Sequence, residues 1–180
     1  MNIKESISSI QSRIAAFYEG NKKRVQMIGF AAIAIIGGTI YWFQFYMPSQ
    51  EKEAEVKFAK LWHYFKTDSL DVVLKGDKAN KIMSAVEIAN KYGMTAKGKE
   101  ASLMAGLAYL KKGEYKKSLD YLDNFNGGDA ILGPSTIAAK AACYSGLGEM
   151  SKAADLYEKA AKLGENEYTS TYYQKAAVHY

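Results

Sequence analysis

The sequence predicts an all-α protein, with a single transmembrane helix near its N-terminus and packed helix hairpins after it. Three observations support this fold class. Residues 25–50 contain no charged side chain. Only two prolines occur among 180 residues, which permits long helices over most of the chain. A segment of the second half returns at an offset of 35 residues, a period typical of stacked helical repeats.

The composition fits one domain of ordinary size with an N-terminal extension. Hydrophobic residues make up 48% of the chain, enough for a core, and the single cysteine, Cys143, excludes an internal disulfide. Residues 1–24 hold five basic and two acidic residues, so they carry +3 of the net charge of +5. Over the rest of the chain basic and acidic residues are interspersed, and we therefore expect no nucleic-acid partner.

Residues 25–47 are predicted to form the transmembrane helix, because a span needs about 20 mainly apolar residues. Aromatic residues, which favour the headgroup level, gather in its last third. Basic residues flanking a span stay in the cytoplasm, and Lys22, Lys23 and Arg24 precede this one. The pattern predicts a cytoplasmic tail over 1–24, a contact with membrane lipid over 25–47, and an outer domain over 48–180.

Two other interpretations of this segment fit less well. A cleaved signal peptide has an apolar region of about 7–15 residues followed by a small-residue cleavage site, and neither is present. A buried core helix would rarely extend so far without a charge. Small residues along the span would permit close approach of another helix, although they also occur in spans without that role: Gly29, Ala34, Gly37 and Gly38.

The tail before the span has its own apolar seam. Ile3, Ile7, Ile10, Ile14 and Phe17 follow one another at steps of four and three, which places them on one side of a helix. One interpretation is an amphipathic helix on the inner leaflet, and the other is docking onto the cytoplasmic surface of a partner. We favour the leaflet.

After the span, Pro48 is expected to break the helix. Three further helices are predicted, over about 50–66, over a short segment from an N-cap at Asp68 to Gly76, and over about 78–92. The expected buried residues of the first are Ala54, Phe58, Leu61, Trp62 and Phe65, and those of the last are Ile82, Val86 and Ala89.

The repeated segment pairs residues 109–122 with residues 144–157. Gly113 and Gly148 are predicted to end one helix in a turn that needs positive φ, and a second helix then folds back. Small residues are expected where the helices cross, at Gly106, Ser118, Ala141, Ala153 and Ala160. A third, incomplete copy is expected near Ala176, so we expect that more chain or another protein covers that end.

This pattern resembles the tetratricopeptide repeat. The positions that carry the likeness are Gly106, Tyr109, Gly113, Tyr115, Ser118, Leu122 and Phe125 in copy one, and Ala141, Tyr144, Gly148, Met150, Ala153, Tyr157 and Ala160 in copy two. Both copies lack the consensus tryptophan, with Ser102 and Ile137 in its place. The resemblance implies an α-solenoid of tetratricopeptide-type hairpins with a concave groove.

The order of tail, span, helix, "LKGDKAN" loop and repeats resembles YfgM-like proteins, the single-span ancillary subunits of the bacterial Sec translocon. That likeness implies a bacterial inner-membrane protein with its repeats in the periplasm. The implied partners are Sec translocon subunits, a membrane-anchored periplasmic chaperone of the prolyl-isomerase class, and exported polypeptides. The alternatives are a scaffold of pilus or outer-membrane assembly, and an import receptor on an organelle with cytosolic repeats.

No catalytic, cofactor or metal site is predicted. His63 and His179 stand alone, Cys143 lies in a helix among small residues, and two histidines with one cysteine do not make a zinc site. By the register of the resemblance, the groove that binds protein is lined by Leu103, Leu107, Leu110 and Lys111 of copy one and by Ala138, Ala142 and Ser145 of copy two. The other interpretation is that these leucines pack against the next repeat.

Overall fold

The computed structural model describes residues 3–125, 132–164, 173 and 176, and the predicted third copy lies almost wholly outside them. The described residues form nine α-helices and one π-helical turn, and none of them belongs to a strand beyond an isolated bridge between Asp77 and Ile82. They divide into two compact units, residues 1–48 and 49–180. The all-α class is therefore confirmed.

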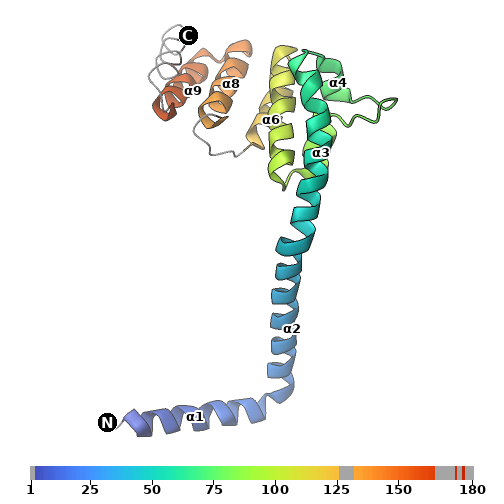
Figure 1. Ribbon diagram of the computed structural model, residues 1–180. Coiled ribbons are helices and arrows are strands. Elements are labelled where there is room, and N and C mark those ends of the chain that lie inside the picture. The colour runs from blue at the N-terminus through green and yellow to red at the C-terminus, as the bar shows by residue number, and fades with distance from the viewer. Residues whose placement is uncertain (1–2, 126–131, 165–172, 174–175, 177–180) are drawn as a thin grey trace. The chain divides into compact units, whose positions relative to one another are not determined.

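The first unit holds α1 (Ile3–Gly20), α2 (Lys22–Tyr41) and the π-helical turn η1 (Trp42–Tyr46). Asn21 separates α1 from α2 and has non-helical backbone angles, φ −127° and ψ 21°. Figure 1 shows the chain changing direction between these two helices. No residue of α2 is buried.

The expected break at Pro48 is wrong, because α3 (Met47–Lys66) continues the helical backbone directly from η1. A proline inside an α-helix lacks an N–H and its ring clashes with the carbonyl four residues earlier. Here the preceding turn is wider, and the N–H of Met47 donates to the carbonyl of Trp42, five residues back. The widened turn accommodates the ring of Pro48 without ending the helix.

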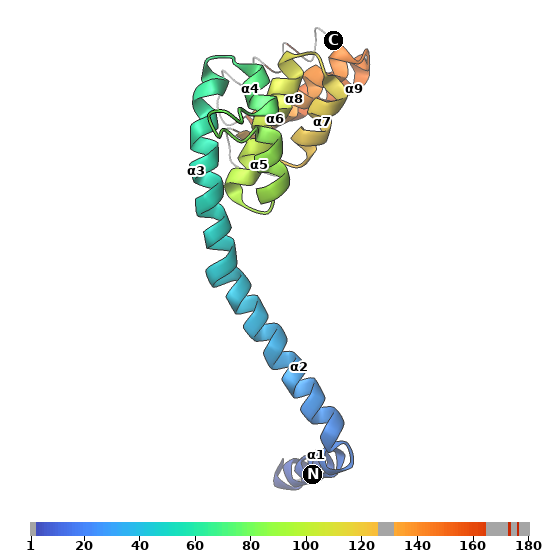
Figure 2. The ribbon, with the colours of Figure 1, turned by 90° about the vertical axis from the view of Figure 1, so that its right-hand side faces the viewer.

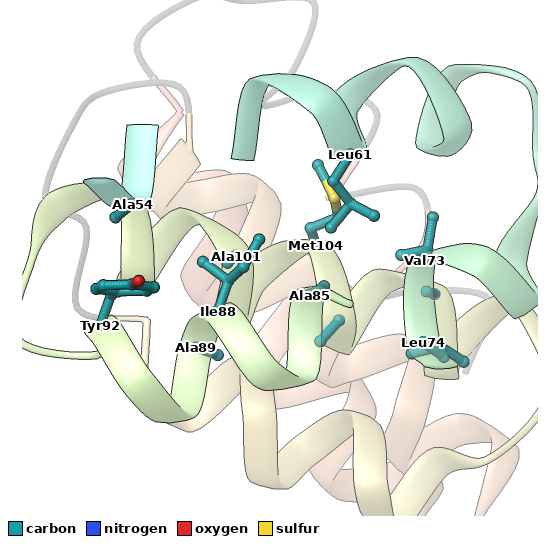
Figure 3. Close-up of a cluster of buried hydrophobic side chains, with 12 residues drawn as sticks. Ala54, Leu61, Val73, Leu74, Ala85, Ile88, Ala89, Tyr92, Ala101 and Met104 are labelled. Carbon is teal, nitrogen blue, oxygen red and sulfur yellow. The ribbon is translucent and has the colours of Figure 1, made fainter. Parts of the chain in front are cut away.

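In the second unit α3 packs on α5 (Ala85–Tyr92) and α6 (Ala96–Lys111), and Figure 2 shows α3 beside them. Ala54 and Leu61 of α3 are fully buried, and Phe58 and Phe65 are half-buried against the same cluster, as predicted. Trp62 departs from the prediction, because 43% of its surface is exposed and Lys66 lies 5.5 Å from its ring. Figure 3 shows the first core cluster, to which α3, α4, α5 and α6 contribute: Ala54, Leu61, Val73, Leu74, Ala85, Ile88, Ala89, Tyr92, Ala101, Met104, Ala105 and Ala108.

Two predicted boundaries between α3 and α5 are wrong. The short helix α4 (Leu70–Lys75) follows Ser69, while Asp68 adopts a φ of 57° and pairs with Lys111 instead of capping the helix. The helix predicted from residue 78 begins only at Ala85. A tight turn precedes it, in which the carboxylate of Asp77 accepts hydrogen bonds from the backbone and side chain of Asn80. This local pairing competes with helix formation and delays its start.

Two helix hairpins complete the unit, α6 with α7 (Tyr115–Asp123) and α8 (Leu132–Gly146) with α9 (Met150–Leu163). A second core cluster joins α6, α7 and α8: Leu103, Leu122, Phe125, Ala139 and Cys143. The small residues predicted at helix crossings are all buried, namely Gly106, Ser118, Ala141, Ala153 and Ala160. Only a small residue fits at Gly106, because a Cβ there would lie 2.7 Å from the side chain of Leu122.

Candidate functional site

The helical segment 22–66 contains the one stretch, within the described residues, that is long and apolar enough to cross a membrane. The side chains of α2 are exposed, with 74% of Phe30 and 69% of Ile33 accessible. Aromatic rings stack in pairs at its far end, Trp42 on Tyr46 at 4.5 Å and Tyr41 on Phe45 at 5.9 Å. An apolar helix with exposed side chains is suited to lipid rather than water.

The small residues of this helix lie on its exposed surface. A Cβ added to Gly29, Gly37 or Gly38 would meet no atom within 4 Å, and Ala34 is exposed as well. A contact with a helix of another protein at these positions stays a prediction.

The two hairpins have the same turn at equivalent positions. Gly113 and Gly148 adopt positive φ, 73° and 81°, as the sequence predicts. The N–H of Glu114 donates to the carbonyl of Tyr109 over 2.9 Å, and that of Glu149 donates to Tyr144 over the same distance. Both glycine N–H groups donate to carbonyls three residues back at 3.0 Å. Each turn is therefore a Schellman motif.

Side chains around the two turns also correspond. Lys117 pairs with Glu114 at 2.6 Å and Lys152 pairs with Glu149 at 3.0 Å. The same lysines lie over the rings of the paired tyrosines, 5.5 Å from Tyr109 and 4.4 Å from Tyr144. The offset of 35 residues therefore reproduces one arrangement of turn, ion pair and ring, so the hairpins are copies of one structural unit.

The predicted groove residues of copy one lie in different surroundings. Leu103 is buried in the second core cluster, and Leu107 and Leu110 are half-buried against it, where the packing interpretation places them. Lys111 is exposed, pairs with Asp68 at 2.5 Å and lies 5.8 Å from the ring of Phe65. Of these four residues, only Lys111 is exposed on the surface.

In copy two, Ala138, Ala142 and Ser145 are half-buried on α8. A protein-binding role for the residues of both copies stays a prediction.

Cys143 is fully buried, as the sequence predicts, and it links three helices. Its thiol donates to the hydroxyl of Ser118 at 3.1 Å, and that hydroxyl donates to the carbonyl of Gly106 at 2.7 Å. Burial raises the pKa of the thiol, so little thiolate forms near neutral pH. The chain of hydrogen bonds holds α6, α7 and α8 together, a structural role.

The described histidine, cysteine, aspartate and glutamate side chains do not gather into a metal-binding group. His63 is exposed with its ring edge-on to Tyr64 at 5.7 Å, and His179 lies outside the described residues. No group of three histidine, cysteine, aspartate or glutamate side chains in the described part is placed to hold a metal ion. A polar depression of about 280 Å³ is lined by Asn90, Lys99 and Asn124 among others, and no acid–base pair faces it.

Sequence analysis did not predict two features of the second unit. The exposed Trp62 with its neighbour Lys66 was expected in the core, because its position fits the apolar seam of α3. Glu51 binds the first turn of α6, accepting hydrogen bonds from the N–H groups of Ala96 and Lys97 at 2.7 and 3.0 Å. No local signal indicates this contact, since the partners are more than 40 positions apart.

Comparison with known proteins identifies no relative: no family model, no curated protein and no solved structure matches this chain.

Proposed function

We propose that this chain is a membrane-anchored, non-enzymatic scaffold that holds other polypeptides. Residues 25–47 cross the bacterial inner membrane, with residues 1–24 in the cytoplasm and residues 48–180 in the periplasm. The hairpins act as tetratricopeptide repeats that associate with the Sec translocon and with a membrane-anchored periplasmic chaperone of the prolyl-isomerase class. In this role the protein assists newly exported chains.

The observation that carries the proposal is that one hairpin turn recurs at an offset of 35 residues in a chain that also contains an exposed apolar helix. Gly113 and Gly148 have the same cap, and Lys117 and Lys152 repeat the same ion pair and ring contact. Helix repeats of this period stack to form extended binding surfaces. The uncharged residues 25–50 within a continuous helix support the anchor.

The test is purification of the tagged full-length chain from native membranes in mild detergent, followed by identification of the bound proteins. An unrelated single-span protein with the same tag serves as control. We expect translocon subunits and the chaperone to be enriched over the control. Enrichment of pilus or outer-membrane assembly components would favour the second scaffold role, and recovery of no partner would contradict the proposal.

Orientation is tested separately by protease digestion of intact cells and of spheroplasts. We expect residues 48–180 to be cut only in spheroplasts, where the periplasmic side is open. Protection in both preparations would place the repeats in the cytosol, the orientation of the import-receptor alternative.

A further inference from the structure

The tail helix α1 carries an apolar seam whose side chains are exposed. Ile7, Ile10, Ile14 and Phe17 are 50%, 54%, 63% and 64% exposed. Their steps of three and four place them on one side of the helix, with Ser12 and Ala16 on the other. Leaving four large apolar side chains in water is unfavourable, because apolar surface gains free energy when it is removed from water.

Helix α1 ends at Gly20, and the following residue, Asn21, satisfies carbonyls of its last turn. The backbone N–H of Asn21 is shared between the carbonyls of Phe17 and Tyr18, at 3.1 and 3.2 Å, and its side-chain amide donates to Phe17 at 3.1 Å. Helical geometry resumes at Lys22. Because of this break, α1 and α2 do not share one helix axis. The seam on α1 can therefore lie at the membrane surface while α2 crosses the bilayer.

The charges near the break are basic. Arg13 is exposed on α1, and Lys22, Lys23 and Arg24 are exposed on the first turn of α2, while the acidic residue Glu19 is exposed near the end of α1. Basic residues close to a membrane are attracted to its anionic lipids. The helix thus presents an apolar seam beside a cluster of cations, the composition of helices that lie in a lipid interface.

We propose that α1 is an interfacial membrane helix that lies along an anionic phospholipid surface. The seam of Ile7, Ile10, Ile14 and Phe17 enters the acyl region, and the basic cluster at 22–24 binds the headgroups. This inference rests on the proposed membrane anchor and adds a second attachment, one that depends on lipid composition.

A second copy of the chain is the competing occupant, because steps of three and four also fit a coiled-coil seam. The seam is short, whereas coiled coils repeat over three or four heptads or more. Residues that would flank a paired seam include Lys4 and Arg13, which share one sign and offer no complementary charges. The lipid surface explains both the apolar seam and the basic cluster, and the coiled coil explains only the first.

The test places one environment-sensitive probe on each side of α1 in the full-length chain. Ile10→Cys labels the seam and Ala16→Cys labels the opposite side, both in a Cys143→Ala background. The labelled chains are reconstituted into vesicles of phosphatidylcholine with phosphatidylglycerol and into vesicles of phosphatidylcholine alone. Quenching is measured with a quencher attached to lipid acyl chains and with aqueous iodide.

We expect lipid-attached quenchers to act several-fold more strongly on the Ile10→Cys probe than on the Ala16→Cys probe, with the opposite order for iodide. The difference should grow when phosphatidylglycerol is present. A seam probe open to iodide, in chains that float with the vesicles, overturns this inference and leaves the anchor intact. A seam probe shielded from both quenchers overturns it in favour of pairing between copies. Chains that do not float overturn the anchor itself.

Discussion

Gly98 shows how a single residue decides the packing of two helices. A Cβ at this position would lie 1.8 Å from the carbonyl oxygen of Tyr92. That carbonyl is held in place, because it accepts hydrogen bonds from the N–H and the hydroxyl of Thr95 at 2.8 and 2.7 Å. The hydroxyl of Thr95 in turn caps α6 at the N–H of Gly98. Backbone meets backbone here, and no flexible side chain can move aside.

We therefore expect Gly98→Ala to destabilise the domain by about 1–3 kcal/mol, although alanine has the higher helix propensity. Urea unfolding measures the change. The control is Lys99→Ala on the next residue, a half-exposed position where we expect a change within about 0.5 kcal/mol. Equal effects of the two substitutions would contradict the close approach at Gly98.

The burial of Cys143 predicts that its thiol reacts slowly with thiol-specific reagents. Its side chain is fully buried and burial raises the pKa of the thiol, so both access and thiolate formation require opening of the domain. We expect the reaction with an aromatic disulfide reagent at neutral pH to follow unfolding. A destabilised variant should react faster, about tenfold for each 1.4 kcal/mol lost. Fast labelling of the native domain, at the rate seen in urea, would contradict this.

At the scale of elements, Glu51 fastens α3 to the start of α6. Its carboxylate accepts hydrogen bonds from Ala96 and Lys97 at 2.7 and 3.0 Å, where the helix N-terminus favours negative charge. We expect Glu51→Ala to cost about 0.5–2 kcal/mol of stability, as loss of a helix cap does. Glu55→Ala on the exposed side of the same helix is the matched control. If both variants unfold alike in urea, the contact does not stabilise the domain.

An ion pair between Asp71 and Lys112 links the start of α4 to the end of α6. Hydrogen bonds from Lys112 and Lys75 hold the pKa of the Asp71 carboxyl below its ordinary value of 3.8. A lowered carboxyl pKa stabilises the folded state above the unfolded-state value, and that stabilisation is lost as pH falls through the folded-state value. Stability should therefore fall on acidification below about pH 4.

The matching measurement is an NMR titration of the Asp71 carboxyl. We expect Lys112→Met to raise its pKa toward 3.8, because the strongest hydrogen bond and a nearby positive charge are lost. Lys116→Met, at an exposed position on α7, is the control and should leave the titration unchanged. An unchanged pKa in the Lys112 variant would show that the pair does not persist in solution.

For the domain of residues 49–180 as a whole, α6 belongs to both core clusters. Met104 and Ala105 lie in the first cluster and Leu103 in the second, so neither cluster can come apart without disturbing the same helix. We infer that the domain unfolds as one cooperative unit.

The test compares Leu61→Ala in the first cluster with Leu122→Ala in the second, both at fully buried positions. Each should cost about 2–5 kcal/mol and move one common transition, followed both by circular dichroism and by Trp62 fluorescence. Two separate transitions would contradict a shared core.

The sequence predicted correctly those features that depend on residues close together in the chain or on a regular repeat. The hairpin turns at Gly113 and Gly148 require positive φ, which glycine adopts without strain, and the repeat offset placed both correctly. The burial of Gly106, Ser118 and Ala153 followed from the need for small residues at close helix crossings. The groove residues were harder, because core-facing and groove-facing positions share one period, and Leu103 lies in the core cluster.

Errors arose where a local preference was overruled. A proline normally ends a helix, but the wider π-helical turn before Pro48 leaves room for its ring. Asp68 is a good cap residue, yet its carboxylate pairs with Lys111 of a helix distant in sequence. The S-x-x-E motif at Ser84 and Glu87 forms a full capping box and was a readable signal for the start of α5.

The sequence by itself determined the all-α class, the uncharged apolar helix, and the pair of hairpins with their glycine turns. These depend on periodicity and on backbone preference, which act between near neighbours. Tertiary structure alone decided that Glu51 caps α6, that Trp62 stays exposed, and that Cys143 and Ser118 join three helices. Such contacts depend on which segments meet in space, and no pattern within one helix encodes its partner.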